Sequence, residues 1–178
     1  MNSQEAVNEI SEVDFAIQRI AGLLRHGGGM LTSGDVARLR RMDPRRPDAA
    51  FFKLEGLVLE EVLPGEVRKR SELETSWAAI IVGLAHLGDL HTPGLRLGHA
   101  LVDARFSELR FSRLLQADLD RLIDELPMLA RFLTAKGVLV DWAQAAWLIL
   151  TVGTAGEERT RRNVARDYYR SLASEQNQ

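Results

Sequence analysis

The chain has 178 residues, of which 46% are hydrophobic and 27% charged, and its formal net charge is −2. This composition supports a packed core and excludes a wholly disordered chain, and no apolar run approaches the roughly 20 residues that a membrane span needs. There is no cysteine, which excludes disulfides, thiolate metal sites and a cysteine nucleophile.

Apolar residues at helical spacing predict four helices before residue 88. The expected ranges are 3 or 11 to 25, 34–42, 50–62 and 72–87. Ser33 is expected to cap the second helix, and Ser71 with Glu74 to form a capping box at the fourth. The three glycines at 27–29 are expected to form a flexible linker between the first two helices. A phosphate-binding loop is not expected, because no Gly-Lys-Ser/Thr follows them.

The turn-forming segment at 88–94 is the strongest internal break, and five helical stretches follow it. Their expected ranges are 95–102, 107–117, 119–136, 142–152 and 157–172. Pro127 lies inside the third stretch, so either a kink or two separate helices is expected there. Asp141 and Gln144 have capping-box spacing at the start of the fourth.

No segment shows sustained two-residue alternation, so the predicted class is all-α without a sheet. We expect about eight helices in two small bundles packed together, formed by residues 1–93 and 94–178. The acidic residues 1–12 are left open as helix or disordered chain. They lack the basic and apolar regions of a secretory signal, and a cytoplasmic protein is expected.

Arginines gather in three clusters, and lysine is scarce. Residues 38–46 hold five arginines against one aspartate, and further clusters lie at 105–113 and 159–170. Arginine contacts phosphate with two parallel N–H groups, which lysine cannot do. Codon usage that favours arginine also explains the high ratio of arginine to lysine. The three clusters together, however, indicate an acidic polymer as the partner.

The chain carries no recognisable catalytic pattern. His26, His86, His91 and His99 do not form H-E-x-x-H or any other pair at i,i+4 spacing. Nucleophile-elbow, phosphoryl-transfer and dinucleotide-binding motifs are also absent. We therefore predict a non-enzymatic protein with no cofactor and no metal.

Several short motifs occur in a characteristic order between residues 34 and 169. In the first half these are Leu39-Arg40-Arg41 and Ala50-Phe51-Phe52-Lys53-Leu54. In the second half they are Gly94-x-x-Leu97-Gly98-x-Ala100-Leu101, Arg105, Glu108-x-Arg110, Leu114-Leu115, Leu129-x-Arg131-x-Leu133-Thr134 and Asp141-Trp142. Their order and spacing resemble the CasB family, the small subunits of the type I-E CRISPR surveillance complex, Cascade.

The resemblance implies a non-catalytic subunit that forms a homodimer within Cascade, beside its backbone and large subunits. Such a subunit braces the heteroduplex of guide RNA and target DNA, together with the displaced DNA strand. Its phosphate contacts ignore sequence, because guide pairing supplies the specificity. The family's basic positions fall here on Arg40, Arg41, Lys53, Arg105, Arg110, Arg131, Arg159 and Arg161.

Helical-face geometry adds Arg38, Arg113 and Arg121 to the expected nucleic-acid contacts. His99 and Gln116 stand where the family often has arginine, so the resemblance leaves contacts at those two positions open. Two other functions remain open. One is a helix-turn-helix DNA-binding regulator that uses residues 33–42 for recognition. The other is a helical adaptor whose arginines contact acidic protein surfaces.

Overall fold

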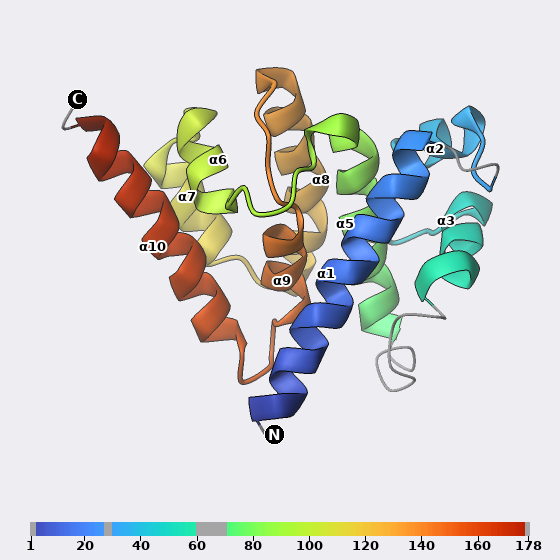
Figure 1. Ribbon diagram of the computed structural model, residues 1–178, viewed down its shortest axis with the longest axis horizontal. Helices are drawn as coiled ribbons and strands as arrows, with labels where there is room; N and C mark the ends of the chain where they lie inside the picture. The colour runs from blue at the N-terminus through green and yellow to red at the C-terminus, as the bar shows by residue number, and fades with distance from the viewer. Residues whose placement is uncertain (1–2, 27–29, 60–70, 177–178) are drawn as a thin grey trace.

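The computed structural model describes residues 3–26, 30–59 and 71–176, and all regular structure in these ranges is helical (Figure 1). Nine α-helices are present there, with a π-helical turn at Glu55–Leu59 and a 3-10 turn at Gly88–Leu90. The same ranges contain no strand, although an isolated bridge pairs His91 with Val140. The predicted all-α class is confirmed.

Helix α5, Ser71–Leu87, is the centre of the fold, as its nearly all-round apolar sequence predicted. It packs along α8, Leu119–Lys136, and also contacts α1, Ser3–His26, and α9, Ala143–Leu150. The Trp142 indole lies directly on Gly83, where an added Cβ would be 2.3 Å from the ring. Its N–H donates to the Ile80 carbonyl at 3.0 Å, which fixes the start of α9 on α5.

In the first half, α1 begins at Ser3, and α2, Ser33–Leu39, is capped by Thr32 rather than by Ser33. The Thr32 hydroxyl accepts from the Asp35 N–H at 3.1 Å, and the Asp35 carboxylate accepts from the Thr32 N–H at 2.9 Å. The prediction of Ser33 as the cap is therefore wrong by one residue. The glycines at 27–29 and the side chain of Ser71, which the predicted capping box requires, lie outside the described residues.

Helix α3, Ala49–Leu54, begins at the Asp48 cap and passes directly into the π-helical turn. It packs against α2, and α2 packs against α5. Figure 1 shows α2 and α3 together on the right flank of the molecule.

In the second half, α10, Glu157–Gln176, lies along α6, Leu97–Asp103. The two backbones touch at Gly98, where a Cβ would be 2.5 Å from the Tyr168 nitrogen. The Tyr168 hydroxyl donates to the Phe106 carbonyl at 2.8 Å, and its ring stacks on Phe111 of α7, Glu108–Leu115, at 3.8 Å. Helices α6, α7 and α10 thus form the left flank in Figure 1.

Helix α8 runs as one helix through Pro127, so of the two alternatives expected there, a kink or two separate helices, the second is wrong. It ends at Gly137, whose φ of 65° is the left-handed conformation that closes many helices. Pro127 lies inside this helix and is buried.

The capping-box prediction at Asp141 and Gln144 is also wrong. Asp141 accepts from the Ala143 N–H at 3.1 Å and from the Gly94 N–H at 2.8 Å. The Gln144 side chain instead accepts from the Leu97 N–H at 2.8 Å, at the start of α6. These bonds tie the loop before α6 to the start of α9.

A single hydrophobic core contains buried residues from both sides of the 88–94 segment. The packing of α5 on α8 and on α9 crosses this segment. The two parts of the chain therefore share one core, with α9 between α1 and α10 in Figure 1.

Candidate nucleic-acid interface

Helix α8 has acidic residues in its first half only. Its first half carries Asp120, Asp124 and Glu125, whereas residues 126–140 contain no aspartate or glutamate. Arg131 and Lys136 lie in that second part, and both side chains are exposed. At about 100° per residue these two positions lie near opposite edges of the exposed arc of the helix. The exposed side of the C-terminal half of α8 therefore carries basic residues and no acidic ones.

Arg40 lies beside this half of α8, although it comes from the other part of the chain. Its Nε donates to the carbonyl of Ala85, at the end of α5, at 2.6 Å. The neighbouring residue is His86, whose pKa is lowered first by burial and further by the charges of Arg131 and Arg40. The carbonyl of His86 accepts from the Thr134 hydroxyl of α8 at 3.2 Å, less than one turn from Arg131. The structure brings together Arg40 and Arg131, two of the predicted contacts.

Arg110 approaches α8 from the opposite edge. Its Cζ lies 4.4 Å from the ring centroid of Phe106 and 4.9 Å from that of Phe132. The Lys136 ammonium lies 6.0 Å from the Phe132 centroid. We call the surface formed by Arg40, Arg110, Arg131 and Lys136 the α8 basic face. None of the four forms an ion pair with a described residue.

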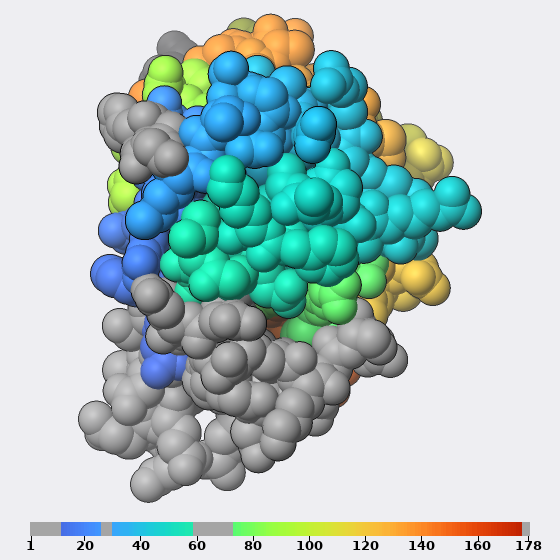
Figure 2. All heavy atoms as spheres, turned by 90° about the vertical axis from the view of Figure 1, so that its right-hand side faces the viewer, coloured from blue at the N-terminus to red at the C-terminus, as the bar shows by residue number. Residues whose placement is uncertain are grey.

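The acidic first half of α8 is neutralised by neighbouring arginines. Arg45, from the loop between α2 and α3, forms an ion pair with Asp124 and donates to the Asp120 carbonyl at 3.0 Å. Figure 2 shows this loop, in cyan, next to the yellow and orange of α8. The predicted contact Arg121 lies 3.6 Å from Glu125, one turn further along α8. Arg121 is thus paired, unlike the cations of the α8 basic face.

Two other predicted contacts also have internal partners. Lys53 lies 3.1 Å from Asp35 and joins α3 to the start of α2. The Thr32 N–H and the Lys53 ammonium lower the pKa of Asp35 to about 2. Arg161 is largely buried and donates to the carbonyls of Leu115 and Ala117, the latter at 2.7 Å. Its guanidinium holds the end of α7 against α10.

The remaining predicted contacts are exposed and form no ion pair with a described residue. Arg38 and Arg41 lie at the end of α2, and Arg105 lies in the turn before α7 with a φ of 56°. Arg113 is in the last turn of α7, and Arg159 is in the first turn of α10. Since α10 and α2 lie on opposite flanks in Figure 1, these residues do not form one patch.

A comparison with protein families gives one match, to a model described as CRISPR-associated protein Cse2, over residues 35–169. The chain belongs to the Cse2 family. This is the family also called CasB, so the predicted resemblance is confirmed. No curated protein and no solved structure matches the chain.

Membership of the Cse2 family implies the role of the small subunit in Cascade, which is a structural and generally non-catalytic role. Within the ranges the structure describes, no three His, Asp or Glu side chains gather as a metal site would require. None of the helices in these ranges combines the length and the apolar character of a membrane span.

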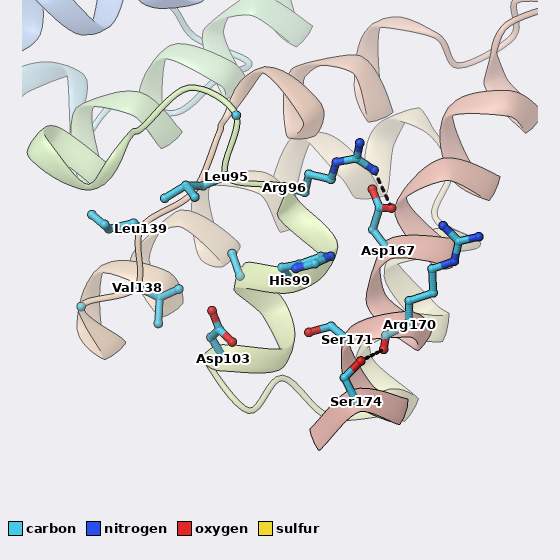
Figure 3. Close-up of a pocket in the computed structure, with 13 residues that line it drawn as sticks. Leu95, Arg96, His99, Asp103, Val138, Leu139, Asp167, Arg170, Ser171 and Ser174 are labelled. Atoms are coloured by element: carbon cyan, nitrogen blue, oxygen red, sulfur yellow. Dashed lines mark hydrogen bonds and ion pairs between the residues drawn. The ribbon is translucent and has the colours of Figure 1, made fainter. Parts of the chain in front are cut away.

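A hollow on the left flank of this Cse2 protein lies between α6, α10 and residues 137–139 (Figure 3). Arg96 pairs there with the buried Asp167 at 2.9 Å, and His99 lies between this pair and the half-exposed Leu139. None of the predicted nucleic-acid contacts lines the hollow. The ion pair fixes α10 to the start of α6, which is a structural role.

Lys136, which belongs to the α8 basic face, and Phe132, which contacts two of its cations, were not among the site residues expected from the sequence. The absence of acidic residues from 126–140 is the signal that could have indicated Lys136. No sequence signal places Phe132 against Arg110, because their contact joins two helices of unknown relative position.

Proposed function

We propose that this Cse2 protein braces the guide RNA–target DNA heteroduplex and the displaced DNA strand through phosphate contacts that ignore sequence, with the α8 basic face as its main contact surface. The supporting observation is the C-terminal half of α8, which carries two exposed cations and no carboxylate and is flanked by Arg40 and Arg110. Unpaired cations on rigid helices suit a partner whose charge is regular and whose sequence varies.

The other predicted contacts extend this proposal to different degrees. Arg38 and Arg41 continue the surface past the end of α2, and Arg105, Arg113 and Arg159 lie further along the left flank. Lys53, Arg121 and Arg161 contribute less, because a phosphate must compete with an existing carboxylate or carbonyl partner. The proposed partners are the backbone and large subunits of Cascade, the guide RNA, both DNA strands and a second copy of this chain, in the cytoplasm.

Nothing in the structure favours a helix-turn-helix regulator. The candidate recognition helix α2 has seven residues and packs against α3 and α5. A protein adaptor would use the same exposed arginines, so the experiment must separate it from a nucleic-acid brace.

Co-expression with the other Cascade subunits and a guide RNA tests the proposal. The chain is expected to co-purify with the guide-loaded complex and to increase its affinity for any DNA that matches the guide. Failure to co-purify contradicts the proposal. Co-purification with no effect on DNA affinity would indicate an adaptor, and selective binding of one duplex by the isolated chain would indicate a regulator.

A further inference from the structure

Two cations from different helices meet at one aromatic ring on the α8 basic face. Arg110 of α7 and Lys136 of α8 both lie against Phe132, at 4.9 and 6.0 Å from its centroid. Neither forms an ion pair with a described residue, and no acidic residue occurs between 126 and 140. Both cations thus lie against the same ring, and neither is neutralised by an ion pair with a described carboxylate.

The ring is a rigid base for these cations. Phe132 meets the buried Phe106 edge to face, with centroids 5.4 Å apart and planes at 63°. The Phe106 backbone is fixed in turn, because its carbonyl accepts the buried Tyr168 hydroxyl at 2.8 Å. Arg110 lies over both rings, so its position is set by two aromatic side chains, one in the loop before α7 and one on α8.

The negative face of an aromatic ring attracts a cation and orients it. A guanidinium whose face is against a ring still has its N–H groups free at the edge, where a phosphate accepts two of them in parallel. An anion that binds beside this ring is attracted by both cations. The free protein therefore holds this pair in an arrangement that an anion completes.

The geometry points to a phosphodiester subsite centred on Phe132, in which Arg110 and Lys136 contact one backbone phosphate and Phe132 is a positioning residue. This inference rests on the proposed nucleic-acid function. It adds Lys136 as a phosphate contact and Phe132 as the residue that positions the cations. The two cations are contributed by α7 and α8, so the subsite also depends on the packing of these helices through Phe106.

The test measures binding of the full-length chain, alone and within the guide-loaded complex, to a fluorescent single-stranded DNA of mixed sequence over a series of salt concentrations. Lys136→Gln is expected to lower the slope of log affinity against log salt by about 0.7. Phe132→Leu keeps the apolar volume but removes the ring, and it is expected to weaken binding about two- to tenfold. Phe132→Tyr keeps the ring and is expected to bind as the unaltered chain does.

A double-mutant cycle separates positioning from a general structural effect. In an Arg110→Gln/Lys136→Gln background, Phe132→Leu should no longer change the affinity, because no cation remains to be oriented. An equal loss in both backgrounds, or an unchanged salt slope in Lys136→Gln, overturns the subsite.

Arg131→Gln serves as the reference on the same DNA. If it lowers the salt slope while Lys136→Gln does not, the subsite is wrong and the proposed function stands. If neither the unaltered chain nor its complex binds the DNA, the proposed function fails and the subsite fails with it.

Discussion

The Nε of Arg40 donates a hydrogen bond to the carbonyl of Ala85 at 2.6 Å. Next to it, the carbonyl of His86 accepts from the Thr134 hydroxyl of α8 at 3.2 Å. The last carbonyls of a helix have no partner within the helix. Here two of them, at the end of α5, are satisfied by donors from the two parts of the chain. This junction holds Arg40 beside α8 and creates a basic face from distant sequence.

Arg161→Ala is expected to destabilise the fold without changing the charge dependence of nucleic-acid binding. Its guanidinium is mostly buried and donates to the Leu115 and Ala117 carbonyls. Loss of hydrogen bonds from a charged donor costs about 1.5–3 kcal/mol. Urea denaturation measures the free energy of unfolding.

Arg162→Ala is the matched control, because Arg162 pairs with Glu158 one turn away and is 74% exposed. Its removal should change stability by no more than about 0.5 kcal/mol. Equal stability losses in the two variants would show that Arg161 does not hold α7 against α10.

Gly98→Ala is expected to force α6 away from α10. The added Cβ would lie 2.5 Å from the Tyr168 nitrogen and 2.8 Å from the Val164 carbonyl oxygen, and backbone atoms cannot rotate away. Overpacking of this kind costs about 1–3 kcal/mol. A thermal unfolding curve should show a lower midpoint.

Gly22→Ala is the control for helix propensity, since nothing lies within 4 Å of the position of its Cβ. Gly22 is inside α1, where alanine is favoured over glycine by up to about 1 kcal/mol. This variant should be as stable as the unaltered chain or more stable. A stable Gly98→Ala protein would contradict the close contact of α6 with α10.

Stability is expected to fall as the pH drops below about 6.5, in part because of His91. His91 is buried, and its Nδ1 accepts from the backbone N–H of Trp142 at 3.1 Å. Burial lowers the pKa of His91 from its ordinary 6.5, and Arg25 lowers it further, against an opposing effect of Asp141. Protonation would remove the acceptor for Trp142.

Stability falls at low pH because the pKa of His91 is lower in the folded state than in the unfolded chain. Above about pH 6.5 the imidazole is neutral in both states, so its contribution to stability is complete. As the pH falls, the unfolded chain takes up the proton first and stability is lost. Burial also lowers the pKa of His86, which adds to the effect in the same direction.

His91→Asn tests this prediction, because an amide oxygen can accept from Trp142 but does not titrate. The variant should show a flatter dependence of the unfolding midpoint on pH between about 5.5 and 7.5. An unchanged pH dependence in the variant would contradict a role for His91.

The features that the sequence predicted well depend on local patterns. Apolar residues at helical spacing predicted the all-α fold. They also identified α5 as the central helix, because a helix that is buried on all sides has few polar positions. The choice of cap at α2 failed by one residue, since Thr32 and Ser33 both carry a hydroxyl. Their backbone conformations decide between them.

The missed features depend on contacts across the chain. Gln144 has the spacing of a capping box but bonds to Leu97, which only the packing of α6 against α9 makes available. The contact between Arg110 and Phe132 joins two helices in the same way. Arg161 was expected to contact phosphate from the family resemblance, yet its guanidinium is turned onto the carbonyls at the end of α7.

The most direct test of the α8 basic face is the salt dependence of target DNA binding by the guide-loaded complex. Arg40→Gln, Arg131→Gln and the double variant are compared, with Arg162→Gln as a control outside the face. Circular dichroism and co-purification establish that each variant folds and assembles.

Each single variant is predicted to lower the slope of log affinity against log salt by about 0.7–0.9, and the double variant by about twice that. The decrease should be the same for guides of different sequence, and Arg162→Gln should have no effect. Unchanged slopes in Arg40→Gln and Arg131→Gln would contradict the account.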